Sequence, residues 1–216
     1  MNADFGLMLV TDRGLSAGRS LDDLVLAAVR GGVTIVQLRE KDVSTREFVA
    51  MGRRLAELLR TRRIPFIVND RVDVAMAVLA DGVHLGQSDM SPADARSLLG
   101  PKAIIGLSVE TVEQATAADR LDVDYLGVSP VFATPTKKDT SAPLGIEGLW
   151  RLRPLTRKPL VAIGGINLAN AARVLEAGAD GLAVVSAICA ASDPESAARE
   201  LRAIIDGRRQ RQGGHP

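Results

Sequence analysis

Short runs rich in Val, Ile and Leu recur eight times along the 216-residue chain, and stretches with helical periodicity separate them. Most of these runs are apolar throughout, which is typical of strands buried on both faces of a parallel sheet. Eight strand–helix units of about 27 residues are the minimum for a closed barrel, and we predict an α/β chain forming a single (β/α)₈ TIM barrel. An open, doubly wound sheet is the structural alternative. The expected strands span residues 7–11, 35–38, 65–68, 82–85, 104–107, 125–128, 160–163 and 181–185.

Helix start signals stand between these runs. Ser or Thr occupies several expected N-cap positions and is followed by Pro, or by Glu or Gln three residues later. Asn or Asp precedes the last two expected helices. The predicted caps are Ser44, Ser91, Thr111, Asn167 and Asp193.

One domain is expected, because no linker or low-complexity segment interrupts the pattern. We assign residues 1–206 to a catalytic barrel domain. Residues 207–216, with the sequence GRRQRQGGHP, are expected to form a polar, disordered C-terminal tail. Hydrophobic residues make up 46% of the chain, which is enough to bury a sizeable core.

The charge balance limits the classes of partner. The chain has 27 basic and 26 acidic residues and lacks the basic excess of nucleic-acid-binding proteins. No apolar stretch reaches the roughly 18 residues of a membrane span. The lone Cys189 cannot form an internal disulfide, and the N-terminus lacks a secretory signal pattern. We expect a cytoplasmic protein that acts on small molecules, not on nucleic acid or membranes; the oligomeric state is not defined, and a homo-oligomer is compatible with the sequence.

Polar residues follow each expected strand, at the end of a (β/α)₈ barrel that carries the chemistry. A period of two places Gln37, Arg39 and Lys41 on one side of the second strand and its extension. The planar guanidinium and the point charge of an ammonium together suit a phosphate. An ordinary rim of salt bridges is the alternative.

Two carboxylates, Asp70 and Asp89, end neighbouring strands and could share one Mg²⁺ with phosphate oxygens and water. The alternative is that each carboxylate caps the helix that follows it. Zinc is a poor candidate, because the chain has only two histidines, His84 and His215, and one cysteine. His84 lies within a strand, and we expect it to pack in the core and not to act in catalysis.

A second anion site is expected near the last strands. The loop of about residues 130–145 contains Thr134-Pro135-Thr136-Lys137 and could close on an anion, although a plain surface loop is the alternative. Gly164-Gly165 and Val185-Ser186 follow the seventh and eighth strands, where barrels of this kind commonly bind phosphate.

These motifs together resemble those of the thiamine-phosphate synthase family over about residues 5–205. The matching segments are QLREK at 37–41, ND at 69–70, GVHLGQSD at 82–89, GLS at 106–108, TPTKKD at 134–139, IGGI at 163–166 and VVSAI at 184–188. Their order and spacing are jointly specific, although each motif alone is weak.

The resemblance implies a transferase on a (β/α)₈ barrel that joins 4-amino-2-methyl-5-pyrimidinylmethyl diphosphate to a thiazole phosphate, or to its carboxylated form. The products would be thiamine phosphate and pyrophosphate, formed by Mg²⁺-assisted dissociative loss of pyrophosphate and attack of the thiazole nitrogen. One Mg²⁺ per subunit would be held by Asp70 and Asp89.

The same resemblance implies two sets of substrate-binding residues. Those for the pyrimidine diphosphate would be Gln37, Leu38, Arg39, Glu40, Lys41, Asn69, Ser108 and Lys137, of which Arg39, Lys41, Ser108 and Lys137 would be catalytic. Those for the thiazole phosphate would be Thr134, Pro135, Thr136, Gly165, Val185 and Ser186.

Three other functions are alternatives to this one. A Schiff-base aldolase would need a lysine on a strand inside the barrel, whereas Lys41 and Lys137 follow their strands. A thiazole-aromatising relative typically lacks the full set of Mg²⁺ and diphosphate residues. A sensor that binds a phosphorylated metabolite without chemistry would differ only in the absence of turnover.

Overall fold

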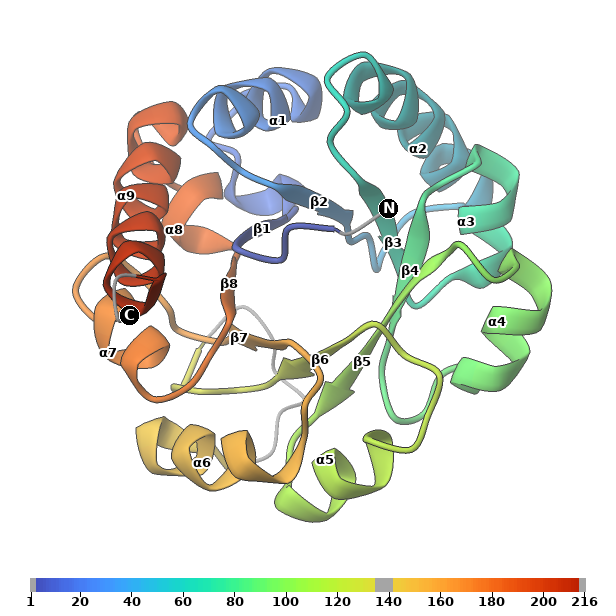
Figure 1. Ribbon diagram of the computed structural model, residues 1–216. Coiled ribbons are helices and arrows are strands. Elements are labelled where there is room, and N and C mark those ends of the chain that lie inside the picture. The colour runs from blue at the N-terminus through green and yellow to red at the C-terminus, as the bar shows by residue number, and fades with distance from the viewer. Residues whose placement is uncertain (1–2, 135–141, 214–216) are drawn as a thin grey trace.

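The computed structural model describes residues 3–134 and 142–213. Within these residues eight parallel strands close into a barrel, each paired with its two neighbours in chain order and β8 with β1. Figure 1 shows the strands at the centre and the helices around them. The predicted TIM barrel is confirmed, and the sheet is not open. The strands are β1 Leu7–Val10, β2 Ile35–Leu38, β3 Phe66–Asn69, β4 Gly82–Leu85, β5 Ile104–Val109, β6 Tyr125–Val128, β7 Leu160–Ile163 and β8 Gly181–Val184.

Helices connect the strands and cover the outside of the barrel. Two short 3₁₀ helices, η1 Arg13–Leu15 and η2 Arg153–Leu155, add single turns. The α-helices of the described chain are α1 Leu21–Arg30, α2 Thr45–Arg60, α3 Val72–Val78, α4 Pro92–Leu99, α5 Val112–Ala118, α6 Gly145–Leu152, α7 Ala171–Glu176, α8 Ser186–Cys189 and α9 Pro194–Gly213.

Most of the predicted N-caps are confirmed by hydrogen bonds from the first turn of the helix. Ser44, Ser91 and Thr111 each accept one from the backbone N–H three residues later. Asp193 accepts bonds from the N–H groups of residues 195 and 196 at the start of α9. The prediction for Asn167 is wrong, because a turn follows this residue and α7 begins only at Ala171.

Side chains of the strands alternate between two separate layers of core. Val83 and Leu85 of β4, for example, pack outward in the large cluster beneath the helices. A smaller cluster fills the barrel interior and includes Met8, Ile35 and Tyr125. Inward-facing residues near the carboxyl ends of the strands therefore form the floor of whatever site lies at that end.

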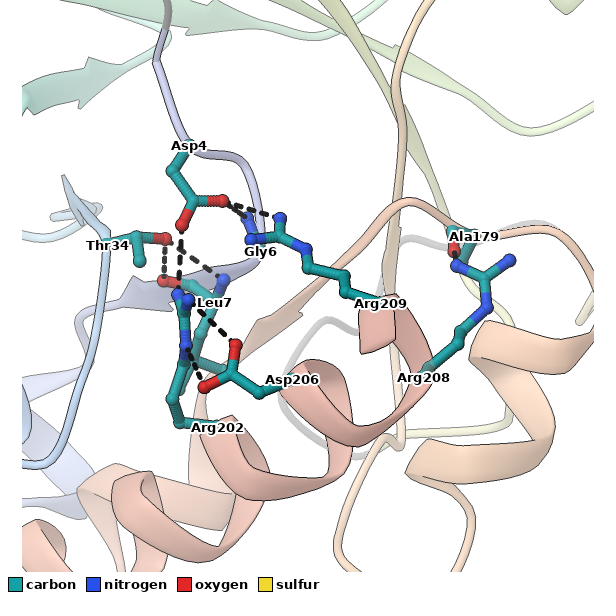
Figure 2. A network of polar contacts seen from close by, with 9 residues as sticks. All are labelled: Asp4, Gly6, Leu7, Thr34, Ala179, Arg202, Asp206, Arg208 and Arg209. Atoms are coloured by element: carbon teal, nitrogen blue, oxygen red, sulfur yellow. Dashed lines mark hydrogen bonds and ion pairs between the residues drawn. The ribbon is translucent and has the colours of Figure 1, made fainter. Parts of the chain in front are cut away.

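The C-terminal segment differs from the prediction, because α9 continues through residues 207–213, which were expected to be disordered. Asp4, ahead of β1, pairs with Arg202 at 2.9 Å and Arg209 at 2.6 Å, while Arg208 donates to the carbonyl of Ala179 (Figure 2). These contacts hold the last turns of α9 against the amino end of the barrel. Arg202 also pairs with Asp206 one turn along the helix.

Among the helices of residues 3–134 and 142–213, none has both the length and the apolar character that crossing a membrane would require.

Candidate active site

A cavity of about 560 Å³ opens at the carboxyl ends of the strands. Almost every described residue that the sequence placed in a site lines it. These residues are Gln37, Arg39, Lys41, Asn69, Asp70, Asp89, Ser108, Thr134, Gly165, Val185 and Ser186. Of the other predicted residues, Leu38 and Glu40 do not line the cavity, and Pro135, Thr136 and Lys137 lie outside the described residues.

The segment after β2 turns two cations into the cavity. The backbone N–H of Arg39 donates to the hydroxyl of Thr11 at 3.1 Å, and the N–H of Thr11 donates to the carbonyl of Gln37 at 2.9 Å. Thr11 is completely buried and so fixes this end of β2. Arg39 and Lys41 line the cavity together with Gln37, as the period of two predicted.

Two predicted diphosphate residues do not line the cavity with their side chains. Leu38 is fully buried in the outer core, because its position in the strand alternation points it toward the helices. The carboxylate of Glu40 pairs with Arg13 at 3.0 Å. Burial raises the pKa of Glu40, although the guanidinium of Arg13 opposes the shift. Side-chain roles for Leu38 and Glu40 in substrate binding are therefore not supported.

Asp70 and Asp89 come together at the tips of β3 and β4. Burial raises the pKa of Asp70, and the charge and hydrogen bond of the neighbouring Asp89 raise it further, against the opposing effect of Lys41 and Arg39. Asp89 accepts a hydrogen bond from the N–H of Gly86 at 2.7 Å, within its own turn. Neither carboxylate caps the following helix, since the N-cap positions of α3 and α4 are other residues.

The oxygen ligands offered by this pair of carboxylates are compatible with Mg²⁺. In the described part of the chain no group of three or more His, Cys, Asp or Glu side chains could hold a metal ion. Mg²⁺ commonly takes only one or two carboxylates and shares its other positions with water and substrate phosphates. A divalent cation between Asp70 and Asp89 would also relieve the repulsion that raises the pKa of Asp70.

Ser108 lies at the end of β5, above two inward-facing aromatic side chains. Its hydroxyl is 2.9 Å from Nε2 of His84, and Nδ1 of His84 is 2.7 Å from the hydroxyl of Tyr125. The amide nitrogen of Gln87 donates to the backbone carbonyl of Ser108 at 2.6 Å. The position of Ser108 is thus set by contacts to both its side chain and its backbone.

On the opposite side of the cavity, two glycines form the turn after β7. Gly164 and Gly165 have backbone φ values of +104° and +65°, which residues other than glycine rarely adopt. A Cβ on Gly165 would lie 2.8 Å from Cβ of Phe132 and 3.0 Å from the carbonyl of Ala133. The amide nitrogen of Asn170 holds the carbonyl of Gly165 at 2.9 Å. Val185 and Ser186 follow β8 and line the same side of the cavity.

The structure adds cavity residues that the sequence interpretation missed. His84 is buried in the barrel as expected, yet it also lines the cavity, and Tyr125, Glu110 and Gln114 line it as well. Strand alternation could have found two of them, because His84 and Tyr125 occupy the inward-facing positions of β4 and β6. Glu110 and Gln114 lie beyond β5, where no strand period applies.

Comparison with known proteins shows the family of the chain. A family model described as thiamine monophosphate synthase matches residues 7–188. The chain belongs to this family. It is 60% identical over 200 residues to thiamine-phosphate synthase of Albidiferax ferrireducens, covering 93% of this chain and 91% of the relative. It is 59% identical over 205 residues to the enzyme of the same name from Solidesulfovibrio magneticus, covering 95% and 97%.

A solved structure shows the same relationship in three dimensions. Thiamine phosphate pyrophosphorylase from Pyrococcus furiosus superimposes with a TM-score of 0.87 at 41% sequence identity, over 95% of this chain and 98% of that one. As a member of the thiamine monophosphate synthase family, the protein is a transferase.

Proposed function

We propose that this protein condenses 4-amino-2-methyl-5-pyrimidinylmethyl diphosphate with a thiazole phosphate, or its carboxylated form, to give thiamine phosphate and pyrophosphate. One observation carries the proposal beyond family membership. A single cavity contains both an acidic pair flanked by Arg39 and Lys41 and, on its other side, the glycine turn at Gly164 and Gly165. Such a cavity can hold two phosphorylated substrates with their reacting ends together.

The diphosphate occupies the side of the cavity formed by the ends of β2 to β5. Asp70 and Asp89 hold Mg²⁺ there, which when bound supplies positive charge to the leaving pyrophosphate. Arg39 and Lys41 add two more cations, and the hydroxyl of Ser108 adds a hydrogen-bond donor. These groups stabilise the negative charge that grows on the leaving oxygen as the carbon–oxygen bond breaks.

The pyrimidine ring makes a dissociative step accessible. Its methylene carbon is benzylic in character, and the 4-amino group donates electrons to the ring as positive charge develops. The cavity lining includes the apolar side chains of Met8, Val161 and Ile163, and we place the pyrimidine ring beside them. Apolar walls of this kind exclude water from a reactive cation.

The thiazole phosphate occupies the side formed by the ends of β7 and β8. Backbone groups of Gly165 and Val185 and the hydroxyl of Ser186 bind its phosphate, which tethers the ring near the pyrimidine carbon. The ring nitrogen attacks with its own free lone pair, so no general base is needed. Holding the two reactants in line supplies much of the rate enhancement.

Product formation from the purified protein tests the proposal. Incubation with both substrates and Mg²⁺ is expected to yield thiamine phosphate and pyrophosphate in equal amounts, measured by chromatography and a coupled pyrophosphate assay. Stabilisation against heat by the thiazole phosphate without release of pyrophosphate would instead favour a sensor. A thiazole product formed without the pyrimidine substrate would favour the aromatising relative.

A further inference from the structure

The barrel interior contains a chain of polar contacts that leads from its centre to the cavity. The hydroxyl of Tyr125 lies 2.7 Å from Nδ1 of His84, and Nε2 of His84 lies 2.9 Å from the hydroxyl of Ser108. The rings of Tyr125 and His84 are stacked, with centroids 5.4 Å apart. Tyr125 is almost completely buried and contributes to the wall of the cavity from the barrel interior, and Ser108 lines the same cavity at the end of β5. The three residues therefore connect the core of the barrel to the proposed diphosphate site.

Two glycines on the neighbouring strands leave room for this series of polar contacts. A Cβ on Gly106 of β5 would collide with the phenol ring of Tyr125, and one on Gly127 of β6 would lie 2.7 Å from Cε1 of His84. Strand register places Gly106 directly between His84 and Tyr125, as the partner of both. The two rings can lie across the barrel only because these positions have no side chain.

The proton positions follow from the acceptors available to Tyr125. Burial raises the pKa of its hydroxyl far above the ordinary value, so the group keeps its proton and must donate it. The nitrogen of His84 is a strong acceptor at 2.7 Å, whereas the thioether of Met8, 4.0 Å away, is a weak one. The Gln37 side chain also hydrogen-bonds to the Tyr125 hydroxyl and lowers its pKa, which is the effect of a donor; the amide nitrogen of Gln37 lies 3.6 Å from the Met8 sulfur. The proton of Tyr125 thus goes to Nδ1 of His84.

This arrangement determines what Ser108 can do. With Nδ1 acting as an acceptor, neutral His84 carries its proton on Nε2 and donates it to the oxygen of Ser108. The hydroxyl proton of Ser108 is then available to a group in the cavity. If His84 were in its other tautomer, Ser108 would donate its hydroxyl proton to Nε2 and would offer the cavity only an acceptor.

We propose that Tyr125 and His84 are positioning residues that fix Ser108 as a hydrogen-bond donor toward the diphosphate leaving group. The identity of this acceptor rests on the proposed function, while the direction of the hydrogen bonds does not. Neither Tyr125 nor His84 needs to touch the substrate. Their effect is to orient one donor before the carbon–oxygen bond breaks, which favours the transition state over the ground state.

Nitrogen NMR of the histidine rings tests the direction of the bonds without any substrate. The chain has only two histidines, and a His215→Gln variant removes the signals of the second. We expect His84 to be neutral, with the proton on Nε2. In Tyr125→Phe we expect a mixture of the two tautomers, because Nδ1 has lost its donor. The Nδ1–H tautomer or an imidazolium in the unsubstituted protein would overturn the proposal.

Kinetics test whether the orientation matters to the reaction. Tyr125→Phe is expected to lower kcat about tenfold, the scale of one hydrogen bond, with KM for both substrates changed less than about twofold. In a Ser108→Ala background the same substitution is expected to have no further effect on kcat. Equal effects in the two backgrounds would show that Tyr125 acts independently of Ser108 and would overturn the proposal.

A pair of substitutions at His84 separates hydrogen bonding from packing. His84→Gln can place an amide N–H near the position of Nε2, and we expect kcat within about fivefold of the unsubstituted protein. His84→Leu has no donor and is expected to match Ser108→Ala. Should the Leu variant fail to fold, the Tyr125→Phe cycle and the NMR measurement still decide. Failure of the proposed function is recognised separately, because the unsubstituted protein would then release no pyrophosphate.

Discussion

The carboxyl group of Asp70 lies against that of Asp89 across the tips of two adjacent strands, in a site where burial already disfavours negative charge. Two carboxylates in such contact need a cation to stay ionised together. The cations nearby, Lys41 and Arg39, act in that direction but leave the pKa of Asp70 raised. The pair is therefore the part of the cavity most sensitive to the presence of a metal.

Removing either the metal or a ligand is expected to stop the reaction. EDTA should abolish pyrophosphate release and added Mg²⁺ should restore it, while Asp70→Ala should lower turnover at least about 100-fold. Asp73→Ala is a matched control, because Asp73 pairs with Arg71 at 2.6 Å on the surface, and such pairs contribute little. Steady-state assays check both. Full activity in the chelator would remove the metal from the mechanism.

Loss of the Ser186 hydroxyl is expected to affect one substrate more than the other. Ser186→Ala should raise KM for the thiazole phosphate several-fold, on the scale of one hydrogen bond, and leave KM for the diphosphate nearly unchanged. Initial rates with each substrate varied in turn give both constants. Equal changes in the two constants would mean that the two sides of the cavity are wrongly assigned.

Thr11 is expected to matter for the diphosphate, although its side chain is buried. Thr11→Val keeps the shape but leaves the N–H of Arg39 without its 3.1 Å acceptor, at a cost of about 1–3 kcal/mol. We expect kcat/KM for the diphosphate to fall. Thr34→Val removes hydroxyl contacts to Leu7 at the other end of the barrel and should reduce stability only. Similar kinetic losses in both variants would contradict the role of Thr11 in positioning Arg39.

A methyl group at position 106 is expected to destabilise the barrel. Gly106→Ala would force a Cβ into the space of the Tyr125 ring, and overpacking of this kind costs about 1–3 kcal/mol. Gly207→Ala offers a control of opposite sign. It lies in α9, its Cβ would have only an ordinary contact at 3.8 Å, and alanine is favoured over glycine within helices. Urea unfolding measures both, and a neutral Gly106→Ala would show that the ring can move aside.

The ion pairs of Asp4 are expected to make stability depend on acid pH. Burial tends to raise the pKa of Asp4, but hydrogen bonds from Arg209 and Arg202 outweigh it and hold the pKa below the ordinary value. A carboxyl group with a depressed folded-state pKa stabilises the protein above its unfolded pKa, near 4, and loses that contribution as pH falls. Because Asp4 is partly exposed, the contribution is about 1 kcal/mol.

Comparison of Asp4→Asn with the unsubstituted protein by urea unfolding at several pH values checks this expectation. The difference in unfolding free energy should be present at pH 7 and should shrink as the pH falls from about 5 toward 2. A difference that stays constant over this range would contradict it.

Much of the barrel could be predicted because its signals are local. Apolar runs marked the strands to within one or two residues, and period-two alternation placed Gln37, Arg39 and Lys41 correctly. The sequence prediction ended β5 too early, since Ser108 is polar yet still pairs with Gly127 as part of the sheet. A polar residue near the tip of a strand can therefore line the site and still belong to the strand.

Other features depend on contacts between distant parts of the chain. The last turns of α9 were predicted as a tail because their sequence is polar, but Arg202 and Arg209 meet Asp4 from 198 and 205 positions away. The contacts of His84 were missed for a related reason. Its partners Tyr125 and Ser108 lie on other strands, and only the closed barrel brings the three together.

Gly106 and Gly127, inside the barrel, couple the substitutions that distant positions in the chain can accept. Since the rings of Tyr125 and His84 occupy the volume that side chains at 106 and 127 would take, a larger residue at either glycine requires a smaller ring opposite. Substitutions at 106 and 125, or at 127 and 84, should therefore appear in pairs among related sequences. A homologue with alanine at the first position and an intact tyrosine would carry a compensating shift of the neighbouring strands.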